Sequence, residues 1–341
     1  MNSLSRILSC TTVVLGGLAV GASAQSYHVT QTYTLGGDGG WDYVALDTAG
    51  HRLFIARSDR VMVVDPATGK LLTEITGLNR AHGIAFAYAA GHGFVTSGGD
   101  SAVVMFDLKT LQVLGRTTAA PDADAILFDP ATKRIFTFNG DSRTSSVVDA
   151  VTGQKIGTID LGAAPEFGVS TGDGKLYVNL EDSSAVAEID PVAMKVTRRW
   201  SLAPCESPTG LASDRAHHRL FSGCRNQVMA ISDATAGKLI TTVPIGQGVD
   251  ACRFDAGSQL AFSSNGDGTL TVVHEDTPDS YHVVANVPTR RGARTMELDE
   301  HTHRLYTVTA DFGPPPAPTP DRPRPRPTIL PGTFALLILE P

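Results

Sequence analysis

The chain has 341 residues, and its 28 lysines and arginines against 35 aspartates and glutamates give a net charge of −7. DNA phosphates repel such a net anion unless a local basic stripe overrides the repulsion, so the charge balance disfavours general nucleic-acid binding. Aromatic residues make up 6% of the chain, which is too few to indicate a broad stacking platform for single strands.

The amino-terminal segment has the pattern of a secretory signal peptide. Arg6 precedes an apolar run, and Ala22, Ser23 and Ala24 supply the small residues that signal peptidase accepts. We therefore expect residues 1–24 to be removed and residues 25–341 to form one mature domain in the periplasm or outside the cell. No second apolar run approaches the length of a membrane span, so none is expected in the mature chain.

The remainder of the sequence consists of a repeated unit. An apolar strand, a polar turn and a second strand recur seven times, with separations of 40, 42, 41, 44, 40 and 45 residues. A period of this length with four short strands per unit is typical of a β-propeller. The prediction is an all-β fold, a seven-bladed β-propeller with four antiparallel strands per blade. The anchor residues of the seven units are Leu53, Gly93, Ile135, Leu176, Leu220, Leu260 and Leu305.

The strands of the first unit are expected at residues 42–46, 52–56, 61–64 and 71–75. Its last turn contains Pro66, which presets φ, and Gly69, which accepts a positive φ. The seventh unit ends with residues 334–339, which match a third strand only. Residues 27–35 match the missing fourth strand, so the N-terminal strand is predicted to complete the last blade and close the ring.

One polar residue stands where the innermost strand of each unit begins. We expect these residues to surround the mouth of the central channel and to bind a ligand there. Three of them, Asp42, Glu166 and Asp250, are candidate ligands of a divalent metal ion such as calcium or zinc. Strand ends beside a water-filled channel are also polar simply because they are wet, and this alternative stays open. The seven positions are Asp42, His82, Asp124, Glu166, Thr209, Asp250 and Arg294.

One segment of the seventh unit departs from the regular repeat. Residues 311–331 contain nine prolines, which favour extended polyproline geometry and cannot join the interior of a sheet. This segment is expected on the same face as the polar ring, as a lid, a partner-binding arm or a solvated linker.

Cys205 precedes the innermost strand of the fifth unit and Cys224 ends its second strand, so a Cys205–Cys224 disulfide is reasonable.

The strand sequences resemble the YVTN-repeat, YncE-like family of β-propellers. The segments that carry the resemblance are Arg52-Leu53-Phe54-Ile55-Ala56, Lys175-Leu176-Tyr177-Val178-Asn179 and residues 263–273. The resemblance covers essentially the whole mature chain and implies an exported seven-bladed propeller. It supplies no agreed catalytic motif.

Three functions are compatible with these patterns. The leading hypothesis is a binding or scaffold protein whose partner is a small molecule, a peptide or a protein. The first alternative is a metal-dependent hydrolase or lactonase, with Asp124 or His82 as general base. It resembles gluconolactonase-type propellers, although this sequence does not reproduce their ligand set.

The second alternative, single-stranded DNA binding, is implied only by the YncE-like resemblance. The sequence contains no H-E-x-x-H and no phosphate-binding loop, and it does not decide whether the chain is an enzyme.

Overall fold

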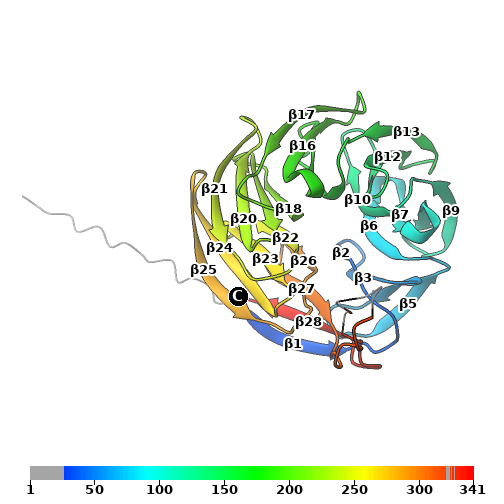
Figure 1. Cartoon of the computed structure of the whole chain (residues 1–341). Coiled ribbons are helices and arrows are strands. Elements are labelled where there is room, and N and C mark those ends of the chain that lie inside the picture. Colours follow the sequence, from blue (N-terminus) through cyan, green and yellow to red (C-terminus); the bar gives the residue numbers. More distant parts are fainter. Residues whose placement is uncertain (1–26, 320–322, 324, 326) are drawn as a thin grey trace, which may run out of the picture.

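Seven four-stranded antiparallel sheets are arranged as blades around a central axis (Figure 1). The computed structural model describes residues 27–319, 323, 325 and 327–341. The predicted signal peptide, residues 1–24, lies outside the described residues. The arrangement confirms the predicted seven-bladed β-propeller with four antiparallel strands per blade.

Each blade contains one strand at each of four positions from the axis outward, and blades one to seven follow the order of the chain. The innermost strands are β2 (Val44–Asp47), β6 (Ala81–Ala87), β10 (Ala123–Asp129), β14 (Pro165–Ser170), β18 (Pro208–Asp214), β22 (Val249–Asp255) and β26 (Met296–Asp299). The second strands are β3 (Arg52–Arg57), β7 (His92–Ser97), β11 (Arg134–Asn139), β15 (Leu176–Leu180), β19 (Arg219–Cys224), β23 (Leu260–Asn265) and β27 (Arg304–Thr309).

The two outer positions complete each blade. The third strands are β4 (Arg60–Val64), β8 (Ala102–Asp107), β12 (Thr144–Asp149), β16 (Ala185–Asp190), β20 (Val228–Asp233), β24 (Thr269–Thr277) and β28 (Ala335–Glu340). The outermost strands are β5 (Leu71–Thr76), β9 (Val113–Thr118), β13 (Lys155–Asp160), β17 (Lys195–Ser201), β21 (Lys238–Pro244), β25 (Ser280–Pro288) and β1 (His28–Thr34).

Short 3-10 turns are the only helical elements among the described residues. They are η1 (Tyr88–Ala90), η2 (Gly98–Asp100) and η3 (Glu181–Ser183). None of the helices in the described part of the chain has the length and hydropathy that a membrane crossing requires.

The hydrophobic core lies between neighbouring blades. All seven anchor residues of the repeat fall in second strands, which are buried almost throughout because a blade covers each of their faces. Buried side chains form seven clusters, each of which joins two adjacent blades. In one of them Phe221 of blade five stacks on Phe254 of blade six, with ring centroids 5.0 Å apart.

The predicted hairpin turns form as their residue types require. In blade one the backbone N–H of Gly69 donates to the carbonyl of Asp65 at 2.8 Å, and Gly69 has a φ of 67°. The Asp65 carboxylate accepts from the backbone N–H of Ala67 and the hydroxyl of Thr68. These bonds fix the register of β4 against β5.

The first strand of the fold lies in the last sheet. β1 pairs antiparallel with β28, and the sheet order is β1-β28-β27-β26 (Figure 1, blue beside red). This confirms that the N-terminal strand closes the last blade. Closure leaves no blade with a missing outer strand and hides the edge of β28.

A buried arginine fastens the segment that leads from the closing strand into blade one. Arg57 is 0% exposed, and its guanidinium lies 3.7 Å from the ring centroid of Phe334. It donates to five successive backbone carbonyls of the glycine-rich loop that follows β1. The acceptors are the carbonyls of Gly36, Gly37, Asp38, Gly39 and Gly40. Three of these glycines have positive φ, which lets the carbonyls turn toward one point.

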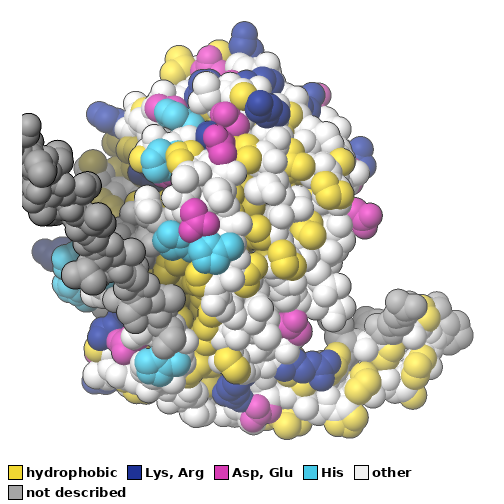
Figure 2. Space-filling view, turned by 90° about the vertical axis from the view of Figure 1, so that its left-hand side faces the viewer, with side chains coloured by type: hydrophobic (Ala, Val, Ile, Leu, Met, Phe, Trp, Pro, Cys, Tyr) yellow, Lys and Arg dark blue, Asp and Glu magenta, His cyan; other side chains and the backbone are white. Residues whose placement is uncertain are grey.

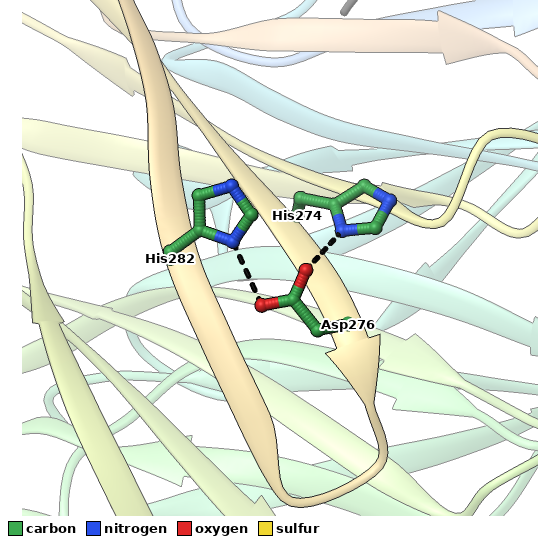
Figure 3. Close-up of side chains that lie close together, drawn as sticks. All are labelled: His274, Asp276 and His282. Carbon is green, nitrogen blue, oxygen red and sulfur yellow. Dashed lines mark hydrogen bonds and ion pairs between the residues drawn. The ribbon is translucent and has the colours of Figure 1, made fainter. Parts of the chain in front are cut away.

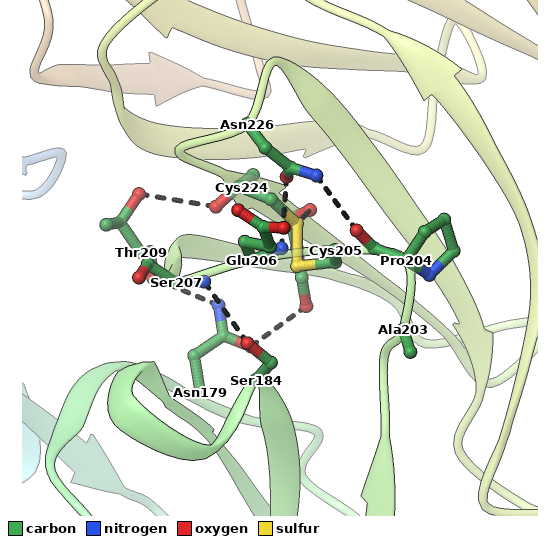
Figure 4. The surroundings of a disulfide bond; sticks show 12 residues. Asn179, Ser184, Ala203, Pro204, Cys205, Glu206, Ser207, Thr209, Cys224 and Asn226 are labelled. Carbon is green, nitrogen blue, oxygen red and sulfur yellow. Dashed lines mark hydrogen bonds between the residues drawn. A yellow bond between two sulfur atoms is a disulfide. The ribbon is translucent and has the colours of Figure 1, made fainter.

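One disulfide joins the two buried cysteines of blade five. Cys205 and Cys224 are bonded, with their Cα atoms 5.6 Å apart (Figure 4). Beside them the side chain of Asn226 donates to the carbonyl of Pro204 and accepts from the backbone N–H of Glu206. The crosslink therefore ties the loop before β18 to the end of β19. Cys252 is buried as a free thiol.

Candidate site at the mouth of the central channel

Five of the seven predicted ring residues are the second residue of an innermost strand, and Asp42 and Arg294 lie two residues before β2 and β26. In five blades the pairing of the innermost with the second strand shifts at this point, and the ring residue lies inside the shift. A β-bulge re-aims the side chain that it contains and is frequent beside functional sites. The residues affected are His82, Asp124, Glu166, Thr209 and Asp250.

Three ring residues from consecutive blades form one cluster. His82 Nδ1 forms a short hydrogen bond with Oδ2 of Asp42 and lies 3.5 Å from Oδ1 of Asp124. One ligand atom from each of the three lies within 4.8 Å of the other two. Gly98 makes room for the imidazole, because a Cβ at that position would lie 2.9 Å from its Cδ2 atom.

The charges of the cluster raise the pKa of two of its members. Burial, together with the charge of Asp42, raises the pKa of Asp124. Burial alone would lower the pKa of His82, but its hydrogen bond to Asp42 and the charge of Asp124 outweigh that effect and raise it. The cluster therefore retains protons readily, and a bound cation would compete with those protons.

Glu166 is not part of this cluster but pairs with an acid of its own blade. Burial, then a hydrogen bond with Glu181 and the charge of Asp124, raises the pKa of Glu166 to about 10. Arg225 lies 2.9 Å from Glu181 and balances its charge. Glu166 is thus a neutral hydrogen-bond donor at physiological pH.

Asp250 and Arg294 face each other on the other side of the mouth, with Arg294 Nη1 3.6 Å from Oδ1 of Asp250. The charge of Asp250 raises the pKa of Arg294, with burial acting against it. Among the described residues, the predicted metal ligands Asp42, Glu166 and Asp250 therefore do not form one tight set. The compact donor set is Asp42, His82 and Asp124.

Thr209 directs its hydroxyl toward the protein backbone. Its side chain is buried, and its hydroxyl bonds to the backbone carbonyls of Gly223 and Val249 at 3.3 and 3.1 Å. These bonds link blades five and six, so the hydroxyl has no proton left to donate to a ligand.

A cavity of about 300 Å³ lies in the channel and is lined by innermost-strand residues of all seven blades. Tyr43 and Phe167 meet across it at 5.6 Å, and Arg253 pairs with Glu297 at 2.8 Å while lying over the Phe167 ring. Burial and the charges of the mouth carboxylates hold the pKa of Tyr43 well above its usual value. Tyr43 therefore remains a neutral phenol beside the acids.

The proline-rich segment begins and ends beside the mouth. Phe312 and Ile329 form an antiparallel bridge, and Phe312 packs near Trp41 with ring centroids 6.0 Å apart. A second cavity, of about 480 Å³, is lined by Trp41, Phe312 and Pro327 and by the side chains of Arg291 and Arg294. The base of this segment thus forms one wall of a pocket that shares Arg294 with the mouth.

The sequence did not indicate several residues of the site. Glu181 and Tyr43 lie outside the ring position, and Arg253 and Glu297 line the channel from the middle of their strands. A charged residue directly between two apolar residues of an innermost strand was the available signal for Arg253 and Glu297. No pattern in the repeat marks Glu181 as the partner of Glu166.

No protein-family model matches the chain. It is 28% identical over 148 residues to the uncharacterized protein YncE of Salmonella typhimurium and to that of Salmonella typhi. The match covers 41% of this chain, and the chain spans 42% of the length of these relatives. Together with the seven blades, this partial match supports a YncE-like propeller.

Solved structures with similar folds include U3-55K and the RRP9 WD40 repeats. Their TM-scores are 0.75 and 0.76, each with 9% sequence identity. The similarity to U3-55K covers 92% of this chain and 99% of that chain, and the similarity to RRP9 covers 93% and 100%. At this identity the likeness shows the propeller fold alone.

The raised pKa of Glu166 gives the folded chain a pH-dependent stability. The carboxyl titrates near pH 4.5 when unfolded and near pH 10 when folded, so stability is lost as the pH rises through this range. The side chain at position 166 carries no charge at any pH in the Glu166→Gln variant. We expect this variant to be more stable than the wild type at pH 8 and equal to it near pH 4 in urea unfolding.

Glu206→Gln is the matched control, because Glu206 is an exposed carboxylate on the same face. Its stability relative to the wild type should not change between pH 4 and pH 8. A Glu166→Gln variant with an equally flat difference would show that Glu166 is ionised in the folded chain.

Proposed function

We propose that this chain is a binding protein that takes up a divalent metal ion at the mouth of its central channel. The observation that carries the proposal is the cluster of Asp42, His82 and Asp124, whose ligand atoms lie within 4.8 Å of one another. Three consecutive blades supply these residues from the same position of the repeat. Two carboxylates and one imidazole suit zinc or a similar ion better than calcium, which takes six to eight oxygen ligands.

The charge of the mouth supports the same proposal. Asp124 and Asp250 lie at the start of innermost strands and Asp42 lies just before one, and the basic ring residue Arg294 pairs with Asp250. A divalent cation beside Asp124 would relieve the repulsion that now raises its pKa. His82 and Asp124 lie in β6 and β10, so little order has to be gained by these two ligands on binding.

We propose further that the protein works outside the cytoplasm. The disulfide of blade five supports this, because such bonds persist in the periplasm and in secreted proteins and are rare in the cytosol. The signal-peptide pattern of residues 1–24 points the same way.

Zinc titration of the mature protein tests the proposed site. We expect Asp124→Asn to weaken Zn²⁺ binding at least tenfold in isothermal titration calorimetry, because it removes one of the three protein ligands. Asp141→Asn is the matched control, since it removes an exposed carboxylate from the same face without touching the cluster. The same number of bound Zn²⁺ ions with the same affinities in the two variants would exclude the mouth as a binding site.

One observation favours a catalytic use of the same residues. Asp42 bonds to Nδ1 of His82, as a carboxylate does when it orients a general base, and Nε2 of His82 has no hydrogen-bond partner. A bound divalent ion would supply Lewis-acid chemistry there. Turnover of ester or lactone substrates that His82→Gln abolishes would establish a hydrolase. Zinc binding without turnover would support the binding role and exclude hydrolysis of these substrates.

The geometry of the mouth does not favour the third hypothesis, single-stranded DNA binding. The acids of the ring repel phosphates, and the aromatic side chains beside the mouth, Trp41 and Phe312, pack against each other. A filter-binding titration with oligonucleotides is expected to show no salt-dependent binding.

A further inference from the structure

A histidine-rich cluster on the outer edge of blade six is far from the mouth and independent of it. The third and outermost strands of this blade, β24 and β25, have nine residues each. Their counterparts in the other blades have five to seven. The β24–β25 hairpin is therefore extended at its tip, and the cluster lies at the base of the extension.

The register of the hairpin brings two histidines together. His274 of β24 lies directly opposite His282 of β25, and their ring centroids are 5.6 Å apart. The pairing then shifts between Glu275 and Thr277, which leaves Asp276 as an extra residue. A bulge of this kind turns the side chain of the extra residue out of its regular direction.

The bulge directs Asp276 toward both imidazoles (Figure 3). Its Oδ1 atom lies 2.9 Å from Nδ1 of His274, and its Oδ2 atom lies 2.8 Å from Nδ1 of His282. One ligand atom of each of the three residues lies within 4.8 Å of the other two. The hydrogen bond from His282, opposed in part by burial, lowers the pKa of Asp276, so the carboxylate is ionised.

Solvent reaches this cluster without any opening of the fold. The side chains of His274, Asp276 and His282 are 34%, 38% and 54% exposed. Figure 2 shows histidine side chains beside acidic ones on the side of the propeller where β21, β24 and β25 lie. An ion can therefore bind and leave at the surface.

We propose that His274, Asp276 and His282 form a second metal site, which binds a borderline divalent transition-metal ion such as Zn²⁺ or Cu²⁺. Imidazole nitrogen is a preferred ligand of these ions, whereas Mg²⁺ and Ca²⁺ prefer oxygen alone. Two histidines and one carboxylate match the protein ligands of open zinc sites, which leave a position for water or a partner's ligand. The metal ion replaces the protons that now join each Nδ1 to the carboxylate.

The number of nitrogen ligands distinguishes this site from the other clusters of the described residues. The mouth cluster contains one histidine, and the remaining cluster, Asp214, His217 and Glu275, also contains one. A two-nitrogen coordination signal is therefore expected only from the blade-six hairpin.

Electron paramagnetic resonance with Cu²⁺ as the probe, combined with Zn²⁺ titration, tests the proposal on the mature protein. The wild type should show hyperfine splitting from two nitrogens. The double variant His274→Gln/His282→Gln should lose that splitting and bind Zn²⁺ at this site at least tenfold more weakly. All three residues lie at the surface of a hairpin, so circular dichroism should show the variant folded.

Two variants complete the test. Asp276→Asn keeps both imidazoles and should weaken Zn²⁺ binding by about tenfold. His301→Gln, in an exposed turn of blade seven, should leave the two-nitrogen signal unchanged. A two-nitrogen signal that survives in the double variant, or a wild type that shows fewer than two nitrogens, would overturn the proposal. Failure of the hairpin site does not affect the mouth site, which Asp124→Asn tests separately.

Discussion

Arg57→Ala is expected to lower the free energy of unfolding by about 3–5 kcal/mol, far more than the loss of a surface arginine would cost. The guanidinium is fully buried and donates to the carbonyls of Gly36 through Gly40. Removing it leaves those carbonyls without their donor and opens a cavity beside Phe334. Burial lowers the pKa of Arg57 to about 10, so the residue remains protonated at physiological pH.

Urea unfolding followed by tryptophan fluorescence measures this effect. Trp41 reports on the region directly, because its ring centroid lies 5.3 Å from that of Phe334. Arg57→Lys keeps the charge but loses the forked geometry, so about half of the destabilisation is expected.

Arg116→Ala is the control for the Arg57 variants. Arg116 is 42% exposed and pairs with Asp100 at 3.3 Å on the surface, where an ion pair contributes less than about 1 kcal/mol. An Arg57→Ala variant no less stable than Arg116→Ala would show that the glycine-rich loop holds its conformation without the arginine.

Removing the blade-five disulfide is expected to destabilise the chain by about 2–4 kcal/mol. Cys205 and Cys224 are 19 positions apart, so their bond closes a loop of moderate length that an unfolded chain would otherwise explore freely. The double variant Cys205→Ala/Cys224→Ala should therefore unfold at a lower urea concentration than the wild type.

The free cysteine provides the matched control for the disulfide. Cys252→Ala removes a buried sulfur atom without removing a crosslink, and it should cost about 1 kcal/mol. Reductant should lower the midpoint of the wild type but leave the double variant unchanged. A wild type insensitive to reductant under unfolding conditions would contradict the stabilising role of the disulfide.

The repeat was sufficient to predict the fold because the apolar strand pattern and the turn residues indicate the same blade structure. The anchors fall in second strands, which are buried on both faces, and turns such as Asp65 to Gly69 fix the register outside them. The closing strand was predictable for a related reason: the seventh unit lacked a fourth strand, and the segment before the first unit matched it.

Only the position of the site in the fold was predictable from the sequence, and the directions of its side chains were not. Counting along the repeat located the ring, but the bulges at its residues decide where each side chain points, and no sequence period reveals a bulge. Thr209 turns to backbone carbonyls, whereas Asp124 turns to His82 from an equivalent bulge. The blade-six cluster was missed for the same reason, because it depends on the extra residue at Asp276.

Closure by β1 has a consequence for biogenesis. Thr30 bonds to the carbonyl of Ile338, a residue 308 positions later, so β1 can pair with β28 only after the whole segment between them has been synthesised. Until then β1 has no partner strand, and contacts of such long sequence separation form slowly. We therefore expect closure of the ring to be a late step in folding, with chaperones shielding the unpaired β1 in the interval.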